Sequence, residues 1–168
     1  MNLKKTINKL HLWLGLSSGL VVFIVAVTGC VYAFQAEIKD LTYPFLFVEP
    51  QQTAVLPPSE ITTIAEEAFP EGHLHAILYP TKEKSAQAIF FSYGEGNDHY
   101  QIAYINPYTG EVLKLKDEYA DFFRIVLDGH FYLWLPPEIG QPVVASFTLV
   151  FLFMVISGLI LWWPKKKK

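Results

Sequence analysis

Residues 10–34 read LHLWLGLSSGLVVFIVAVTGCVYAF, a run with no lysine, arginine, aspartate or glutamate. A second charge-free run, IGQPVVASFTLVFLFMVISGLILWW, occupies residues 139–163. A helix needs about 20 apolar residues to cross a hydrocarbon core of about 30 Å, and both runs exceed that length. A buried helix of a soluble domain rarely stays uncharged for so long. The two runs therefore predict transmembrane helices at residues 10–35 and 139–163.

The charges outside the two runs predict the orientation of the chain in the membrane. Residues 1–9 carry three lysines and residues 164–168 carry four, while all 16 acidic residues and six basic ones lie between the runs. Lysines in short flanking segments stay on the cytoplasmic side. We therefore expect cytoplasmic tails at both ends and an extracytoplasmic segment at residues 36–138. The acidic excess of that segment argues against nucleic acid as a partner. The two spans make membrane lipid an expected partner.

A charged start followed by an apolar run is also the layout of a signal peptide. Residues 27–30, VTGC, resemble the lipobox in which a cysteine is lipidated after cleavage. The apolar run continues beyond Cys30 and is long enough to span, which favours an uncleaved helix. Cys30 is the only cysteine, so it can form no disulfide within the chain. We interpret it as a small apolar packing residue.

One face of the first span combines His11 with mostly small residues. The helical repeat predicts that this face contains Gly15, Ser18, Val22, Ala26, Gly29 and Ala33. One interpretation is close helix–helix packing, which small residues permit in membranes. The other is a slot for a flat cofactor beneath His11. Packing explains the glycines more simply, whereas the histidine favours the cofactor.

The segment that follows the first span predicts a linker and then a helix. Residues 36–58 contain four prolines and are expected to form an extended linker. Ser59 is expected to cap a short helix. The apolar stripe of this helix consists of Ile61, Ile64, Ala65 and Ala68.

An antiparallel sheet is predicted after this helix. Runs rich in β-branched and aromatic residues predict strands at residues 73–79, 87–93 and 99–105. Residues 95–98 turn the second strand into the third. Residues 106–110, NPYTG, form a tight turn in which proline sets φ and glycine takes the left-handed conformation. A last short strand opens at Val112, and the helix packed on this sheet gives a small α+β domain at residues 59–116.

Residues 117–138 predict an amphipathic helix at the outer membrane interface. One side of this helix carries Asp117, Asp121, Arg124 and Asp128, which we interpret as a solvated face. The opposite side carries Phe123, Val126, Leu127, His130 and Trp134. The fold class expected for the whole chain is therefore membrane α-helical, with two spans and one small extracytoplasmic α+β domain.

Three stretches resemble a known family. They are residues 9–16 (KLHLWLGL) with residues 28–29 (TG), residues 105–112 (INPYTGEV), and residues 127–131 (LDGHF) with residues 157–165 (SGLILWWPK). In this order, the chain resembles the amino-terminal half of PepSY-associated transmembrane proteins, which are bacterial inner-membrane proteins often linked to iron uptake. The second stretch resembles the turn that closes a PepSY domain. Family members usually continue into a second helix pair with its own histidines, so the chain resembles a short member or a fragment.

The resemblance carries an expectation about function. Some members resemble ferric-siderophore reductases that pass electrons across the membrane through b-type haems held by histidines. His11 and His130 are thereby implied to be ligands of haem b iron. The implied role is an electron-transfer component of iron reduction or uptake, with a ferric chelate as acceptor. Whether the chain is itself part of a transmembrane ferric reductase stays open.

The two histidines are predicted to lie near opposite membrane faces. At a rise of about 1.5 Å per residue they are on the order of 30 Å apart, so they cannot ligate one iron. Each haem would need a second ligand from the missing helix pair or from another protomer, and a bis-histidine pair suits electron transfer. The alternative is that His11 and His130 are ordinary interfacial residues, since polar groups at helix ends can snorkel.

No catalytic residue is predicted. The chain has no nucleophile motif, phosphate loop or flavin fingerprint. His73 and His75 share a strand face without a carboxylate or cysteine at a comparable spacing, so they are expected to be exposed strand residues. His99 is expected to be solvated. The alternative function is a membrane-tethered PepSY module that binds a peptide, protease or receptor, with an exposed sheet edge accepting a strand.

Overall fold

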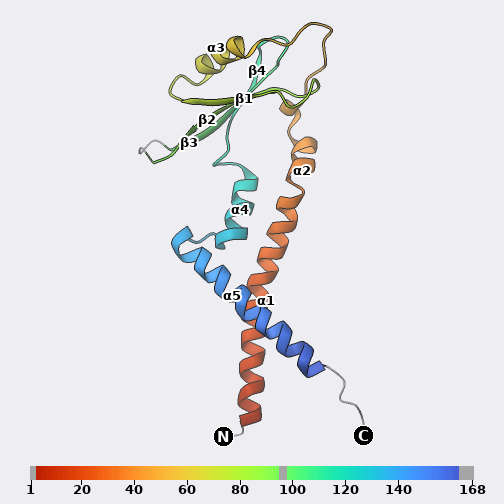
Figure 1. Ribbon diagram of the computed structural model, residues 1–168, viewed down its shortest axis with the longest axis vertical. Helices are drawn as coiled ribbons and strands as arrows, with labels where there is room; N and C mark the ends of the chain where they lie inside the picture. Colours follow the sequence, from red (N-terminus) through yellow and green to blue (C-terminus); the bar gives the residue numbers. More distant parts are fainter. Residues whose placement is uncertain (1–2, 95–97, 163–168) are drawn as a thin grey trace. The chain divides into compact units, whose positions relative to one another are not determined.

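The computed structural model describes residues 3–94 and 98–162, and the chain divides into two units. The helix pair consists of Met1–Phe34 and Ile125–Lys168. The domain is the segment between them, Gln35–Arg124. Figure 1 traces both units. The domain therefore includes residues on both sides of the predicted 59–116.

Two long helices form most of the helix pair. They are α1, Leu3–Ala33, and α5, Pro137–Trp162, and they contact each other. Within them Asn8–Ala33 and Pro137–Leu159 are long and apolar enough to cross a membrane, each with a mean hydropathy of 2.2. Both predicted spans are confirmed as helices. Trp163 and the C-terminal lysines lie outside the described residues.

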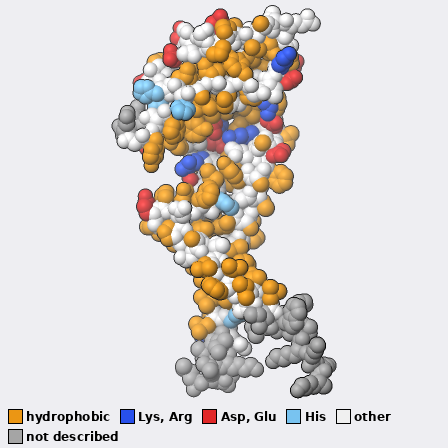
Figure 2. Space-filling model, in the orientation of Figure 1, with side chains coloured by type: hydrophobic (Ala, Val, Ile, Leu, Met, Phe, Trp, Pro, Cys, Tyr) orange, Lys and Arg blue, Asp and Glu red, His pale blue; other side chains and the backbone are white. Residues whose placement is uncertain are grey.

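The apolar side chains of the helix pair point outward. Leu12 and Phe23 of α1 are 65% exposed, and Phe153 of α5 is 61% exposed. Figure 2 shows hydrophobic side chains over much of the helix surface, whereas most of the charged side chains in view lie over the domain. A soluble protein rarely exposes so much contiguous apolar surface. The helix pair therefore requires a hydrocarbon solvent.

The segment after α1 remains helical at first. A turn at Phe34 separates α1 from α2, Gln35–Thr42. The predicted extended linker is therefore wrong in its first part. The earliest proline of the segment is Pro44, so nothing before it removes a helical hydrogen bond. The proline then opens a short 3₁₀ helix, η1, at Pro44–Leu46.

The domain contains one four-stranded antiparallel sheet in the order β1-β2-β3-β4. Its strands are β1 Leu74–Leu78, β2 Ala86–Ser92, β3 His99–Ile105 and β4 Val112–Asp117. Each strand pairs with the next along the chain, which short turns make possible. The predicted antiparallel sheet is confirmed. Strand β4 continues to Asp117, where the sequence had suggested the start of a helix.

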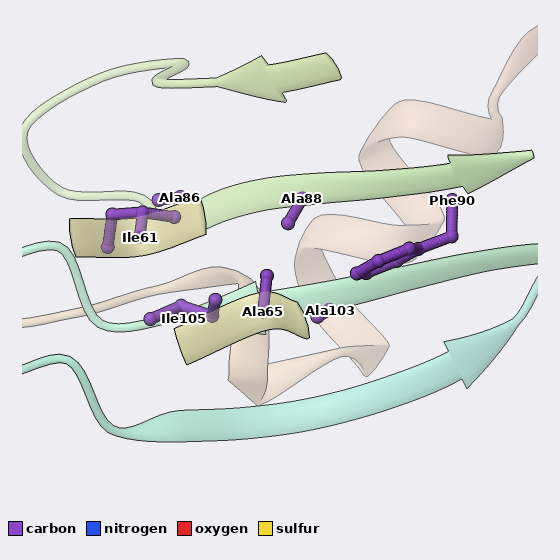
Figure 3. Close-up of a cluster of buried hydrophobic side chains, with 7 residues drawn as sticks. All are labelled: Ile61, Ala65, Ala86, Ala88, Phe90, Ala103 and Ile105. Carbon is purple, nitrogen blue, oxygen red and sulfur yellow. The ribbon is translucent and has the colours of Figure 1, made fainter. Parts of the chain in front are cut away.

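Helix α3, Pro58–Ala68, covers one face of this sheet. Figure 3 shows its Ile61 and Ala65 facing side chains of the two central strands. The fully buried cluster consists of Ile61, Ala65, Ala86, Ala88, Phe90, Ala103 and Ile105. Three alanines on β2 and β3 leave room for the helix, and Phe90 is the largest of the fully buried side chains. The predicted α+β arrangement is confirmed.

The start of α3 differs from the prediction. Pro57 is its N-cap and Pro58 its first residue, so Ser59 lies inside the first turn and caps nothing. Proline suits the first helical position because its fixed φ is already helical and the missing N–H would have no partner there. The carbonyl of Ser59 instead accepts a hydrogen bond from the Thr63 hydroxyl, at 3.2 Å.

The second face of the sheet is covered by residues that precede α3. Leu46 of η1 is buried in a cluster with Ile102 and Tyr104 of β3. The rings of Tyr43 and Phe45 extend this cluster, and Phe45 lies 4.8 Å from the Tyr104 ring. The segment assigned to a linker thus contributes to the core of the domain.

The predicted turn at residues 106–110 forms as expected. Gly110 has φ +77°, a conformation that glycine adopts without steric cost. The Asn106 N–H donates to the Glu111 carbonyl at 2.8 Å, and the Asn106 side chain accepts from the Tyr108 N–H. A Cβ at position 110 would meet Ile64 at 2.8 Å. The turn predicted at residues 95–98 lies mostly outside the described residues.

The predicted interfacial helix is shorter than residues 117–138. Helix α4 covers Phe122–Tyr132, and the boundary between the two units falls within it. Asp121 caps it, because its carboxylate accepts from the Phe123 N–H at 2.7 Å. Leu133 and Trp134 have φ of 53° and 59°, which ends the helix. Trp134 is therefore placed by this turn and not by a helical repeat.

Candidate functional site

His130 is located near the end of α4 and its imidazole packs against α1. Its Nδ1 is 2.9 Å from the carbonyl oxygen of Val25 and 3.5 Å from the Thr28 hydroxyl. Thr28 is buried and donates its own proton to the Ile24 carbonyl at 2.7 Å. The contact joins residues 105 positions apart in sequence. The partly buried side chain is therefore packed against α1.

The Val25 contact assigns the tautomer of His130. A carbonyl oxygen can only accept a hydrogen bond, so Nδ1 must carry the proton that is shared with Val25. A neutral imidazole with its proton on Nδ1 has a free electron pair on Nε2. Within the described residues, Nε2 of His130 makes no hydrogen bond. Metal-ligating histidines commonly donate their second ring N–H to a carbonyl or carboxylate in this way.

Gly29 of α1 lies directly against the His130 ring. A Cβ built at position 29 would come within 2.8 Å of Cε1 and 3.1 Å of Nδ1, while Nε2 is farther away, at 3.8 Å. The Cε1–Nδ1 edge of the ring therefore faces α1. Sequence periodicity placed Gly29 on the face of His11, but its contact is with His130.

The connection from α4 to α5 also depends on close contacts at glycines. A Cβ at Gly129 would overlap the Trp134 ring, and one at Gly140 would overlap the Tyr132 backbone. The Trp134 indole N–H donates to the Ile125 carbonyl at 2.8 Å. These contacts fix the corner that carries His130. The sequence signal was the glycine directly before the histidine, in residues 127–131.

His11 has a different environment. It is partly buried on α1, and its side chain makes no hydrogen bond with any other described residue. On the same face the Cβ position of Gly15 is 3.4 Å from the Met154 methyl of α5, and Ser18 is fully buried. The glycine face is therefore in contact with α5 at this level, which agrees with the packing interpretation. Ala26 and Ala33, assigned to this face, are exposed.

The two candidate ligands lie at different levels of the helix pair. His130 contacts α1 at Val25, Thr28 and Gly29, and Gly29 follows His11 by about 27 Å of helix at 1.5 Å per residue. One iron cannot bridge that distance. The structure therefore does not bring the two histidines together, and each would need another partner.

The remaining histidines are in the domain. His73 and His75 are exposed, and the His75 ring lies 6.5 Å from the Phe91 ring. His99 was expected to be solvated, but it is partly buried, with its ring 5.5 Å from that of Phe69. Among the described residues, no group of three or more His, Cys, Asp or Glu side chains could hold a metal ion.

The domain contains a polar cluster that the sequence did not predict, here called the ion cluster. It consists of Lys39, Tyr43, Lys116, Glu118 and Asp121. The side chain of Asp121 is 2% exposed, and it pairs with the Lys116 ammonium. The Tyr43 hydroxyl donates to the same carboxylate at 2.7 Å. The interpretation of Asp121 as part of a solvated face is therefore wrong.

The ion cluster joins the segment that enters the domain to the segment that leaves it. Lys39 belongs to α2 and lies 3.4 Å from Glu118, which follows β4. Lys116 of β4 lies 2.7 Å from Glu118 and contacts Asp121 as well. Buried charges persist only when they are paired and hydrogen-bonded. Helical periodicity could not reveal these pairs, because the partners of Asp121 come from other parts of the chain. Lys39 belongs to α2, Tyr43 follows α2, and Lys116 belongs to β4.

Protonation in the ion cluster follows from its contacts. Burial alone would raise the pKa of Asp121, but hydrogen bonds from Lys116, Tyr43 and the Phe123 N–H hold it below its ordinary value of 3.8. Burial raises the pKa of the Tyr43 hydroxyl, and the Asp121 carboxylate raises it further. Asp121 is thus ionised and Tyr43 neutral at physiological pH.

One of two comparisons places the chain among known proteins. The model of the family described as the PepSY-associated TM region matches residues 8–168, which is nearly the whole chain. A search of curated proteins finds no match.

Proposed function

Because the chain belongs to the family of PepSY-associated TM proteins, we propose that it is a haem-b-carrying electron-transfer component linked to ferric iron reduction or uptake. The family and the two apolar helices make it a membrane protein of the PepSY type. The observation that carries the proposal is the His130 imidazole, whose Nδ1 is 2.9 Å from the Val25 carbonyl oxygen. This contact leaves Nε2 as the ring nitrogen that would ligate iron.

The chemistry of His130 fits a haem ligand. An imidazole whose Nδ1–H is bonded to a carbonyl has a fixed ring orientation and a more basic Nε2. The ring packs against α1 of an apolar helix pair, and surroundings of low polarity would favour electron transfer over side reactions. A bound haem b would supply a one-electron redox centre at this level of the membrane.

His11 is proposed as the ligand of a second haem. Its place about 27 Å along α1 from the His130 contact gives the separation expected of two haems near opposite membrane faces. Within the described residues, no side chain orients its ring. The second axial ligand of each haem would come from a further helix pair or another protomer.

The proposed location is the inner membrane of a bacterium, with both termini in the cytoplasm. The charge distribution supports this orientation, since every lysine of the two tails flanks a span. Figure 1 shows the start of α1 and the end of α5 at the same end of the helix pair. Residues 36–138 would then be extracytoplasmic, facing a ferric chelate as acceptor.

Cysteine labelling tests this orientation. In a Cys30→Ser background, Lys82→Cys should react with an impermeant thiol reagent in intact cells, because Lys82 is exposed in the domain. Lys4→Cys should react only after the cells are lysed. Labelling of both positions in intact cells, or of Lys4→Cys alone, would overturn the proposed topology.

Absorbance tests the haem. The full chain, purified from haem-replete membranes, should show a Soret band that loses intensity in His130→Ala. In a complex with two haems, His11→Ala and His130→Ala should each remove about half of the haem, because the two sites are independent. His75→Ala, an exposed histidine of the domain, is the matched control. A full Soret band in both ligand variants would contradict the proposal.

A second candidate function is a membrane-tethered binding module. It is supported by the sheet order, which leaves β1 and β4 at the two edges. An edge strand can accept an extended peptide through backbone hydrogen bonds, while side chains at alternate positions provide specificity. A colourless wild-type preparation would favour this function over the first.

A further inference from the structure

We infer that Gly29 is a positioning residue for His130. By having no side chain, it allows the imidazole to reach the Val25 carbonyl, and this contact fixes Nε2 as the ligating atom. The inference rests on the proposed function for the identity of the ligand, but the contact itself is a property of this chain.

The steric basis is the distance between the ring and α1. A methyl group at position 29 would lie 2.8 Å from Cε1 and 3.1 Å from Nδ1 of His130. Carbon atoms that are not bonded prefer separations of about 3.5–4.0 Å. The ring would therefore have to move outward. Such a movement lengthens the hydrogen bond between Nδ1 and the Val25 carbonyl oxygen, which is 2.9 Å long. Bonds of this kind extend only to about 3.2 Å, so a small displacement of the ring weakens the contact.

Backbone conformation does not explain the glycine. Among the described glycines only Gly94 and Gly110 have positive φ, so the backbone conformation at position 29 does not require glycine. A glycine within a helix is less favourable than an alanine. Gly19, on the same helix, has no described side chain of another element within 4 Å of its Cβ position. The two glycines thus differ in what they contact, and only Gly29 faces an imidazole.

Loss of the Val25 contact has a chemical consequence for the ligand. Nδ1 would no longer have a fixed acceptor, so the proton could reside on either nitrogen. The ring would also lose its fixed plane. Removal of such orienting partners typically lowers metal affinity by about 10–100-fold. The Val25 carbonyl belongs to the backbone, so the glycine is the position at which this contact can be altered.

The matched pair Gly29→Ala and Gly19→Ala tests the inference in the full chain. Both replace glycine by alanine on α1, but only the first meets His130. We expect Gly29→Ala to lower haem affinity by about tenfold or more, and to change the low-spin signal of any haem that remains. Gly19→Ala should resemble wild type. Helix content by circular dichroism should be unchanged in both variants.

A readout without haem separates this inference from the proposed function. Nitrogen-15 NMR of histidine-labelled chain distinguishes a ring protonated on Nδ1 from one protonated on Nε2, and His130→Ala identifies the signal. Wild type and Gly19→Ala should show Nδ1 protonation, whereas Gly29→Ala should show a mixture of tautomers. Wild type that binds no haem but shows the fixed tautomer would overturn the proposed function alone. An unchanged tautomer and haem spectrum in Gly29→Ala would overturn the role of Gly29.

Discussion

The helix pair and the domain each depend on a polar contact between segments far apart in sequence, but the two contacts are built differently. In the helix pair, the His130 imidazole donates to the Val25 carbonyl next to a glycine. In the domain, two lysines and two carboxylates pair with one another. Charges are tolerated next to water, whereas a hydrocarbon solvent favours small residues and neutral hydrogen bonds.

The same contrast governs where apolar side chains point. Phe90 is fully buried in the domain, and Phe23 of α1 is 65% exposed. The domain is stabilised by removing apolar surface from water. The helix pair keeps its apolar surface outside, and its helices meet at residues such as Gly15 and Ser18. Water around the domain favours a core of large apolar side chains, whereas hydrocarbon around the helix pair favours small residues where the helices meet.

The largest effect is expected from cutting the domain at the predicted limits. Residues 59–116 lack Leu46 and Tyr43, so Ile102 and Tyr104 would face water. They also lack Lys39 and Asp121 of the ion cluster. A fragment of residues 35–124 should melt cooperatively by circular dichroism, whereas residues 59–116 should show no cooperative transition. Equal melting temperatures of the two fragments would show that the sheet is stable without the residues before α3 that cover its second face.

The next effect compares one substitution in the two regions. Phe90→Ala should destabilise the domain by about 3–5 kcal/mol, because it leaves a cavity between α3 and the sheet. Phe23→Ala in α1 should change the stability of the full chain in detergent by less than about 1 kcal/mol, since the side chain already faces the apolar solvent. Denaturant titration of each variant against wild type measures both. A large loss in Phe23→Ala would indicate a protein partner on that surface.

A smaller effect is expected at the ion cluster. Asp121→Ala should cost about 2–3 kcal/mol, below the 3–5 typical of a fully buried pair because both lysines keep some contact with water. The matched control is Asp40→Ala, which removes an exposed pair with Lys84 and should cost less than about 1 kcal/mol. Melting of residues 35–124 compares the two. Equal losses would mean that burial adds nothing to the Asp121 pairs.

The smallest effect is the pH dependence of that same contact. The pKa of Asp121 is lowered in the folded state, so its contribution is fully present above about pH 4 and is lost as the pH falls further. The difference in stability between wild type and Asp121→Ala should therefore be constant near neutrality and shrink below pH 4. A difference that shrinks already between pH 8 and 6 would assign the effect to another group.

The sequence by itself determined the two spans and the type of domain between them. Length and the absence of charge suffice for a membrane helix, since hydrocarbon accepts little else. Alternating strands and the left-handed Gly110 are equally local signals, and both were predicted correctly. Local signals also misled, as at Ser59, where the neighbouring Pro58 took over the start of the helix.

Only the tertiary structure decided which side chains meet. The helical repeat assigned Gly29 to the face of His11, yet the fold brings it against His130. The same repeat assigned Asp121 to a solvated face, yet Lys116 and Tyr43 enclose it. A periodic pattern reports which face of an element is apolar, but not which distant element covers it. That choice depends on packing between elements that can be as far apart in sequence as Gly29 and His130, and no local pattern encodes it.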